Sequence, residues 1–253
     1  ARAFTATSSQ GLLYMAECLH YASGGRFPIV MMNANRSLAL PWSIYGDQRD
    51  SLSLLDSGWL QVYVEDAQES LDMMIQAYAI AEHKEVLTPV MVNLDGFVLT
   101  HTYELVEVPR QEDVDEFLPP FDTENKLDFE NPKNMCFSSS PADNMEFKYQ
   151  QHKAALKASE IIKKVDQAYR EKFGRGYGGL VDGYKCDDAE IILITLGSVT
   201  GTCRVVVDEL RNQGKKVGVL KIRFMRPFPE KEIIDTTRGA KVIGVLEKDI
   251  SFG

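Results

Sequence analysis

The chain has 253 residues, 44% of them hydrophobic, so it can bury a full core and is long enough for one large or two modest domains. Its formal net charge of -9 excludes a general nucleic-acid-binding surface, because phosphate backbones are bound by clustered Lys and Arg. No apolar run approaches the roughly 20 residues that span a bilayer and no signal peptide opens the chain, so a soluble cytoplasmic protein is expected.

The four cysteines lie far apart, and none forms a C-x-x-C pair. This spacing indicates neither a structural zinc site nor an iron–sulfur ligand set, and free thiols are typical of a reducing cytoplasm. No metal ligand is therefore expected in this chain. The opening ARAFTATSSQ lacks an initiator Met and EKDISFG stops just after a strand-like run, so residues before Ala1 and after Gly253 are expected to be missing.

The first part of the chain alternates between strand and helix patterns. Four apolar or β-branched runs predict strands, at 3–7, 28–33, 59–64 and 89–94. Two helical patterns fill gaps between them, at 10–22 and 67–82. This βαβ order predicts a parallel sheet with helices on its faces.

The second part of the chain resumes the alternation after an interruption. From residue 109 a stretch rich in Pro, Asp, Glu, Asn and Ser predicts a long connection over the surface, followed by a helix over 146–173. Beyond residue 187, three strands and one helix are predicted, at 191–196, 217–222, 241–246 and 200–213. A second α/β domain is therefore expected.

Arg36 is a candidate anion contact. The run IVMM at 29–32 has no polar alternation and predicts a strand inside a parallel sheet, so Arg36 follows at the carboxyl edge, where α/β folds bind ligands. A guanidinium holds a carboxylate through two parallel hydrogen bonds. The alternative is that Arg36 pairs with Asp47, Asp50 or Asp56 to pin the loop. The loop has about two dozen residues without evident secondary structure, which favours a lid or a binding site.

The turn Thr7-Ser8-Ser9-Gln10-Gly11 is a second candidate, because it joins a strand to a helix. Ser and Thr at a helix start cap its free N–H groups, and the same groups can hold a phosphate or carboxylate. A capped helix without any ligand is the alternative, and the chain has no P-loop motif. In VNLDGFVLTH, Asp95-Gly96 is interpreted as an ordinary turn pair, and His101 as either structural or catalytic. ITLGSVTG predicts a plain strand, turn and helix.

Several of these segments together resemble a known family. They are TSSQGL, PIVMMNANRSL, GDQRDSLSLLDSGWLQVYVEDAQESLD, VMVNLDGF, EFLPP, NMEFKYQ, ITLGSVTGT and VGVLKIRFMRPFPEKEI. In this order they resemble the alpha subunits of 2-oxoacid:ferredoxin oxidoreductases, closest to the pyruvate (pyruvate synthase) branch. The likeness runs over nearly the whole chain.

The resemblance implies an α/β fold with two parts. The first is a thiamine diphosphate pyrimidine-binding-type parallel-sheet domain, N-terminally incomplete, over 1–115. A linker and long helix follow over 116–186, and a smaller, partial transketolase C-terminal-like α/β domain covers 187–253.

The resemblance also implies an activity. The family oxidatively decarboxylates a 2-oxoacid, here most simply pyruvate, to acyl-CoA and CO2 and passes electrons to ferredoxin (EC 1.2.7 type). Thiamine diphosphate is shared with a beta subunit, which holds its Mg2+, and the iron–sulfur clusters lie in partner subunits. The implied partners are beta, gamma and delta-type subunits, ferredoxin, coenzyme A and the 2-oxoacid, and the chain alone is expected to be inactive.

The resemblance places Arg36 at the substrate carboxylate and Ser8, Ser9, Gln10 and Gly11 beside the cofactor. The activating glutamate and a YPITP-like substrate motif are expected upstream of residue 1, so no catalytic residue is assignable. GDQRD and GRGYGGLVDGYK depart from the family pattern, which leaves branched-chain and aromatic 2-oxoacids open as substrates. Two further alternatives are a structural assembly subunit without a reacting group and a transketolase-type enzyme without electron transfer.

Overall fold

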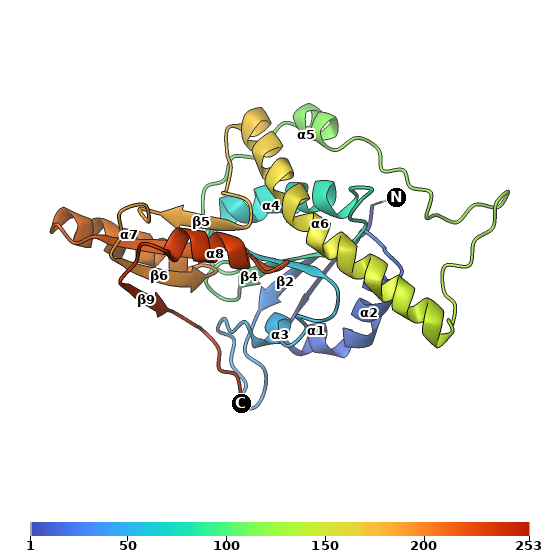
Figure 1. Ribbon diagram of the computed structural model, residues 1–253, viewed down its shortest axis with the longest axis horizontal. Helices are drawn as coiled ribbons and strands as arrows, with labels where there is room; N and C mark the ends of the chain where they lie inside the picture. Colours follow the sequence, from blue (N-terminus) through green and yellow to red (C-terminus); the bar gives the residue numbers. More distant parts are fainter. Residues whose placement is uncertain (1, 253) are drawn as a thin grey trace.

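Two β-sheets carry the fold of this protein, whose computed structural model describes residues 2–252 (Figure 1). The first sheet has the order β1-β2-β4-β3-β8. Its strands are β1 (Phe4–Ser8), β2 (Val30–Asn35), β4 (Val90–Asp95), β3 (Leu60–Tyr63) and β8 (Phe224–Arg226). The first four are mutually parallel, as predicted, whereas β8 runs antiparallel to β3 and comes from far along the chain.

Helices cover both faces of the first sheet (Figure 1). On one face lie α1 (Gln10–Tyr14), α2 (Ala16–Gly24) and α3 (Arg49–Leu52), and on the other α4 (Ala67–Ala81) and α6 (Pro141–Phe173). The strand residues alternate accordingly. Met31 and Met91 pack with Leu12, Leu19 and Trp59 under α1 and α2. Apolar residues of the opposite parity pack under α4 and α6, among them Val30, Val62, Val92, Met73, Ile80 and Ile161.

The helix predicted over 10–22 is interrupted at Met15. The Met15 N–H donates to the Leu12 carbonyl at 3.2 Å, a tight three-residue closure that ends α1, and the Met15 carbonyl then accepts from Leu19 at 3.1 Å in α2. One predicted helix is therefore two short ones.

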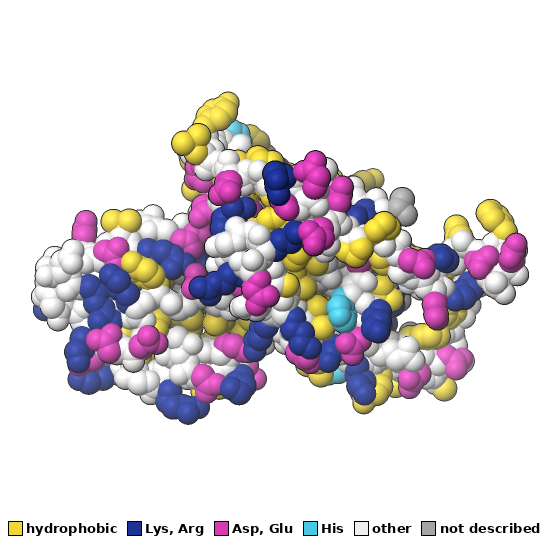
Figure 2. Space-filling model, turned by 90° about the horizontal axis from the view of Figure 1, so that it is seen from above, with side chains coloured by type: hydrophobic (Ala, Val, Ile, Leu, Met, Phe, Trp, Pro, Cys, Tyr) yellow, Lys and Arg dark blue, Asp and Glu magenta, His cyan; other side chains and the backbone are white. Residues whose placement is uncertain are grey.

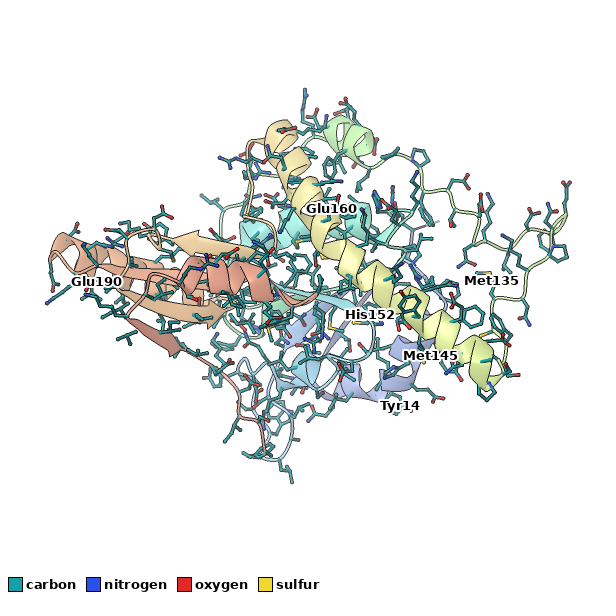
Figure 3. The ribbon with its side chains drawn as sticks, viewed as in Figure 1. Tyr14, Met135, Met145, His152, Glu160 and Glu190 are labelled. Carbon is teal, nitrogen blue, oxygen red and sulfur yellow. The ribbon has the colours of Figure 1, made fainter. Side chains whose placement is uncertain are left out.

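The connection from residue 96 to 140 contains a short helix, α5 (Gln111–Phe117), that the sequence did not indicate. The long helix α6 starts at Pro141 rather than at 146, because the Ser140 side chain accepts the Asp143 N–H at 3.3 Å and Pro141 suits the first helical turn. It ends at Phe173, as predicted, and the following Gly174 forms a left-handed C-cap with a φ of 74°. Met145 lies toward the N-terminal end of α6 and His152 lies where α6 passes over α2, and both side chains are exposed (Figure 3).

The second sheet has the order β5-β7-β6-β9. Its strands are β5 (Val181–Tyr184), β7 (Val217–Ile222), β6 (Ile191–Leu196) and β9 (Val242–Val245). Its helices are α7 (Val199–Asn212) and α8 (Glu230–Thr237). The predicted bounds of β6 and β7 are confirmed. The sequence did not indicate β5, β8 or α8. The second sheet includes β5, which lies before residue 187, whereas β8, which lies after it, belongs to the first sheet.

Buried ion pairs join the two sheets. Glu69 of α4 is 1% exposed and pairs with two cations, Lys221 of β7 and Arg223, which are 2% and 1% exposed. Burial alone would raise the pKa of Glu69, but the two cations outweigh it and lower the pKa to about 2.

On the face of the molecule seen from above, acidic and basic side chains are interspersed (Figure 2). Within residues 2–252, no helix combines the length and apolarity that crossing a membrane requires.

Candidate functional site

The carboxyl edge of the first sheet gathers the two segments that the sequence singled out. Because β1 and β2 pair in parallel with Ser8 opposite Ala34, the residues that follow each strand, Ser9 and Arg36, come to the same edge. The next pairing, Asn35 opposite Asp95, brings the end of β4 there as well. Parallel register therefore assembles the candidate site.

The turn after β1 is held in a strained backbone conformation. Ser9 is fully buried and has a φ of 52°, a region that costs a non-glycine residue about 1–3 kcal/mol. Its hydroxyl lies 2.6 Å from Gln10 Oε1 and 3.0 Å from the Ser37 carbonyl oxygen, so it can donate to one of them. It makes no capping hydrogen bond to α1, and the prediction that Ser or Thr caps this helix is wrong.

The flanking residues of the turn have separate roles. The Ser8 hydroxyl donates to the Ala34 carbonyl at 2.7 Å and so ties β1 to β2. Gly11 lies in the first turn of α1, where a Cβ would meet Thr7 Oγ1 at 2.9 Å. Of the four predicted cofactor-proximal residues, Ser9 and Gln10 are therefore the two whose side chains meet at this edge.

The Arg36 guanidinium is largely uncommitted. Its Nη2 lies 3.4 Å from Gln10 Oε1, and its Cζ stacks 5.5 Å from the centre of the Trp42 ring. Among residues 2–252 it forms no salt bridge. The side chain is half-buried, so an anion that reaches it would be partly desolvated and held more strongly than in water.

The three acids proposed as pinning partners of Arg36 have other partners. Asp47 pairs with Arg49 at 2.5 Å, and the fully exposed Asp56 lies 3.6 Å from Arg226. Asp50 accepts the backbone N–H of Arg36 at 3.3 Å and leaves its guanidinium free. The loop is thus fixed without using the Arg36 charge.

The loop after Arg36 is more ordered than predicted. It contains α3 and lies against the end of β4, where a Cβ on Gly46 would meet the Gly96 carbonyl oxygen at 3.0 Å. Tyr45 packs on Phe97 with ring centres 4.8 Å apart, and Phe97 stacks on His101 at 5.3 Å. Tyr45 and Phe97 therefore form an aromatic wall beside the end of β4. His101 is exposed, and its Nδ1 lies 2.8 Å from the Thr100 hydroxyl.

Asp95 does more than the turn role that its sequence context indicated. One carboxylate oxygen accepts from Gln48 Nε2 at 3.0 Å. The other accepts from the Ser198 N–H at 2.8 Å and the Ser198 hydroxyl at 2.5 Å, and lies 2.7 Å from Lys248 Nζ. The turn in ITLGSVTG therefore docks on VNLDGF, a contact that neither motif signals alone because it joins the two sheets.

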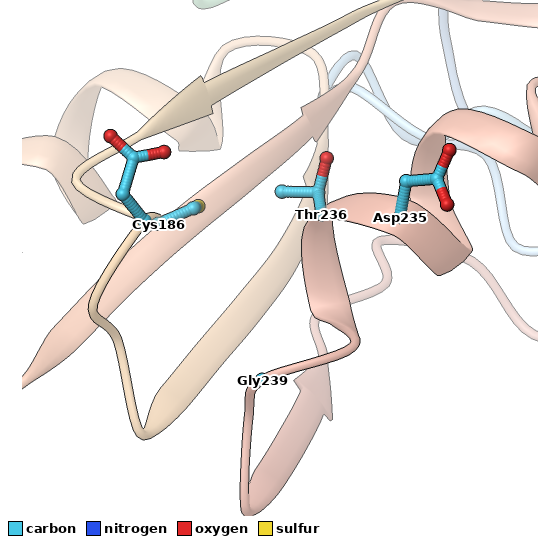
Figure 4. A pocket seen from close by; sticks show the side chains of 5 residues that line it. Cys186, Asp235, Thr236 and Gly239 are labelled. Atoms are coloured by element: carbon cyan, nitrogen blue, oxygen red, sulfur yellow. The ribbon is translucent and has the colours of Figure 1, made fainter.

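The described residues also contain a pocket elsewhere, at the second sheet. It has a volume of about 390 Å3 and is lined by Cys186, Asp187, Asp235, Thr236 and Gly239 (Figure 4). Burial raises the pKa of the Cys186 thiol to about 11, so it stays protonated and is not a nucleophile at neutral pH. Within residues 2–252, no group of three or more His, Cys, Asp or Glu side chains is arranged to hold a metal ion.

Comparison with family models covers both sheets. Residues 1–167 match the model described as pyruvate flavodoxin/ferredoxin oxidoreductase, thiamine diphosphate-binding. Residues 189–253 match the model described as pyruvate:ferredoxin oxidoreductase core domain II.

The chain is similar to several known proteins, among them two curated relatives and one solved structure. The chain is 51% identical over 251 residues to the pyruvate synthase subunit PorA of Methanothermobacter thermautotrophicus, covering 99% of this chain and 65% of that relative. It is 46% identical over 254 residues to the ketoisovalerate oxidoreductase subunit VorA of Pyrococcus horikoshii, covering 100% of this chain and 64% of that relative. The chain thus spans just under two thirds of the length of these relatives. A 2-oxoglutarate:ferredoxin oxidoreductase from Magnetococcus marinus superposes with a TM-score of 0.68 at 20% identity, covering 98% of this chain and 46% of that one, and so shares its fold.

Proposed function

The chain belongs to the pyruvate flavodoxin/ferredoxin oxidoreductase family, and from this premise we propose that it is part of the alpha subunit of an enzyme that oxidatively decarboxylates pyruvate to acetyl-CoA and CO2. The family resemblance drawn from the sequence motifs is confirmed, as is an α/β fold with a thiamine diphosphate-binding domain. The activity, substrate and partners of the whole protein are what we propose.

The observation that carries the proposal is the free cation at the sheet edge. The Arg36 guanidinium has no carboxylate partner among residues 2–252, and it lies beside Gln10 in the turn that follows β1. A 2-oxoacid presents a carboxylate next to its reacting carbonyl, which is the anion that a guanidinium fork binds. In the proposed complex, Arg36 binds that carboxylate and orients the carbonyl toward the cofactor.

The sheet edge also fits a cofactor site that is shared with a partner subunit. Two buried amide oxygens, Asn35 Oδ1 and Gln48 Oε1, have no hydrogen-bond partner within the described residues. When bound, thiamine diphosphate supplies a carbon nucleophile and an electron sink for decarboxylation. Ser9, Gln10 and Gly11 would lie beside it, while a beta subunit would hold its diphosphate and Mg2+.

The remaining chemistry needs partners that we propose on the same grounds. Iron–sulfur clusters of partner subunits would carry the two electrons released with CO2 to ferredoxin, and coenzyme A would take the acyl group and release its thiol proton. Gamma and delta-type subunits complete the complex, which we place in the cytoplasm. The four cysteines of this chain are free thiols, as a reducing compartment favours.

The test replaces Arg36 in the full-length chain, reconstituted with its partner subunits. Loss of one charge-assisted pair costs about 1.5–3 kcal/mol, or roughly 10- to 150-fold in kcat/KM for pyruvate. Arg36→Lys keeps the charge without the fork and is expected to recover part of that loss. Ferredoxin reduction is followed at several pyruvate concentrations, and thiamine diphosphate affinity is measured in parallel and is expected to stay within about twofold.

The outcomes separate the alternatives. If Arg36→Ala leaves kcat/KM within about twofold, Arg36 does not bind the substrate. If, in addition, variants at Ser9 and Gln10 change neither turnover nor cofactor affinity, the chain is a structural assembly subunit. Turnover without a one-electron acceptor would indicate a transketolase-type reaction instead.

A second substrate is favoured by one specific finding. The relative named ketoisovalerate oxidoreductase subunit VorA is 46% identical, close to the 51% of the pyruvate synthase relative. A larger branched side chain would have to fit against the wall formed by Tyr45 and Phe97. Competition between pyruvate and 2-oxoisovalerate for the reconstituted enzyme decides between them. A higher kcat/KM for 2-oxoisovalerate would show that it, and not pyruvate, is the preferred substrate.

A further inference from the structure

Asp50 is a fully buried carboxylate at the start of α3, and it is held by neutral donors. Burial raises its pKa, and the hydrogen bonds offset this only in part. Within residues 2–252 it has no cationic partner. Its oxygens accept from five groups: the backbone N–H of Ser9, Arg36 and Ser51 and the side-chain amides of Asn33 and Asn35.

One oxygen of Asp50 connects the two halves of the candidate site. Oδ2 lies 3.1 Å from the Ser9 nitrogen and 3.3 Å from the Arg36 nitrogen, and these two residues follow β1 and β2 directly. Ser9 has the positive φ described above, a conformation that persists only where its surroundings fix it. A single atom therefore sets the spacing between the Ser9–Gln10 turn and the backbone that carries the Arg36 side chain.

The other oxygen anchors Asp50 itself. Oδ1 accepts from Asn35 Nδ2 at 2.7 Å and from the Ser51 N–H at 2.8 Å. Asn35 Nδ2 also lies 2.8 Å from the Ser51 hydroxyl, which is 2.7 Å from the hydroxyl of the buried Tyr63. These hydrogen bonds connect the Asp50 carboxylate to β2, α3 and β3. A shift of Asp50 would therefore move the residues at the sheet edge.

We propose that Asp50 is a positioning residue that holds the Arg36 backbone and the Ser9–Gln10 turn at a fixed spacing, so that the Arg36 guanidinium meets the 2-oxoacid carboxylate. This inference rests on the proposed function of Arg36. It goes further in assigning the geometry of that contact to a carboxylate that touches neither substrate nor cofactor.

Replacing Asp50 with Asn tests the acceptor role with little change in volume. An amide offers one acceptor oxygen and one donor nitrogen, so buried N–H groups on one side would face another donor. Each such unmade bond is costly in a buried site, and the Arg36 backbone would move to relieve it. KM for pyruvate is expected to rise about tenfold in the full-length, reconstituted enzyme, with a smaller change in kcat.

Asp166 supplies a control that also binds backbone N–H groups, and it differs from Asp50 in lying 3.7 Å from the Arg223 guanidinium. It is 7% exposed and likewise accepts backbone N–H groups, from Tyr177 at 2.9 Å and Gly179 at 3.1 Å, but it holds the end of α6 rather than the sheet edge. Asp166→Asn is expected to lower the thermal midpoint as Asp50→Asn does, while KM for pyruvate stays within about twofold. Equal rises in KM for both variants would show a general loss of fold and overturn the proposal.

A double variant separates this proposal from the proposed function. With Arg36→Ala in place there is no guanidinium to position, so at saturating thiamine diphosphate adding Asp50→Asn is expected to change kcat/KM for pyruvate by less than about twofold. Multiplicative losses would mean that Asp50 acts independently of Arg36 and would overturn the positioning role. An unchanged kcat/KM in Arg36→Ala alone would instead refute the substrate contact itself.

A milder variant covers the case in which Asp50→Asn does not fold. Asn33→Ala removes one donor, 3.3 Å from Asp50 Oδ2, and leaves the carboxylate in place. A rise of about threefold in KM for pyruvate is expected, and the rise should disappear in the Arg36→Ala background. A KM within experimental error of the parent enzyme would overturn the proposal.

Discussion

Asp95 and Ser198 join the two sheets: the Asp95 carboxylate accepts both the backbone N–H and the hydroxyl of Ser198, at 2.8 and 2.5 Å. Ser198 directly precedes α7, so an acid from the first sheet lies at the positive end of a helix of the second. The preceding residue, Gly197, has a φ of 72°, and a Cβ there would lie 2.8 Å from both Asp95 Oδ2 and Gln48 Nε2. Contact between the sheets therefore depends on the absence of a side chain at Gly197.

Gly197→Ala is expected to destabilise the protein by about 2–4 kcal/mol, because it adds a steric clash to the cost of a left-handed backbone. Gly214→Ala is the control. Gly214 has a similar φ of 79°, but a Cβ there meets nothing within 4 Å, so about 1–2 kcal/mol is expected. Urea unfolding followed by circular dichroism measures both, and equal losses would contradict the clash.

The buried group of Glu69, Lys221 and Arg223 predicts a pH dependence of stability. Its two cations outweigh burial and lower the folded-state pKa of Glu69 to about 2, below the unfolded value of 4.5. The stability that Glu69 contributes is thus fully present above about pH 4.5 and is lost as the pH falls from there toward 2. Urea unfolding between pH 3 and 7 should show this decline, and the decline should be shallower in Glu69→Gln, because other acids with lowered pKa values, such as Asp72, remain.

Glu69→Gln is also expected to be costly at neutral pH. It leaves the two buried cations with only their longer contacts, Lys221 to Glu65 at 3.3 Å and Arg223 to Asp166 at 3.7 Å, so a cost of about 3–5 kcal/mol is expected. Glu190→Gln is the control, because the Glu190–Lys241 pair is exposed at the far end of the second sheet (Figure 3), and a change below about 0.5 kcal/mol is expected. Similar losses in the two variants would rule out a special role for the buried group.

The cysteines predict a pattern of chemical reactivity. Cys18 and Cys136 are exposed, whereas burial raises the pKa of Cys186 to about 11 and also raises that of Cys203. A maleimide at neutral pH should label the two exposed thiols first and the two buried thiols only after unfolding, because the thiolate is the reactive form. Peptide mass spectrometry reads out the sites, and early labelling of Cys186 would contradict its buried position.

Trp42 is expected to support Arg36 through their stacking contact. An exposed cation–π contact contributes about 0.5–1 kcal/mol, so Trp42→Ala should raise KM for pyruvate roughly two- to fivefold in the reconstituted enzyme. Leu40→Ala changes another exposed apolar residue of the same loop, 91% exposed, and should leave KM unchanged. If both variants raise KM equally, the effect belongs to the loop and not to the stack.

The sequence predicted the elements whose signal is local. The runs at 191–196 and 217–222 are apolar enough to define β6 and β7 to the residue, and IVMM placed Arg36 at the correct sheet edge. β8 was missed because it has three residues and exists through pairing with β3. β5 was missed because its VDGY sequence is short and interrupted by a glycine.

The sequence predicts where the candidate site lies but not the hydrogen bonds that hold its residues in place. The sequence indicates Asp50 only as a pairing partner for the Arg36 side chain, because a sequence does not show which atoms of a buried carboxylate accept hydrogen bonds from the backbone. Asp95 was interpreted as a turn residue for a related reason: its partner Ser198 belongs to the other sheet. A single sequence contains no periodic pattern that indicates contacts between segments far apart in the chain.

The position of β8 determines when the first sheet can be completed during synthesis of the chain. Gln61 and Val62 of β3 pair with Arg226 and Phe224, so one edge of the first sheet has no partner strand until residues 224–226 have left the ribosome. Up to that point the nascent chain presents an apolar, unpaired strand to its surroundings, which is a hazard for aggregation during synthesis. Stalled or prematurely terminated translation products that lack β8 should therefore be captured by chaperones that bind exposed strands, whereas those that include it should escape.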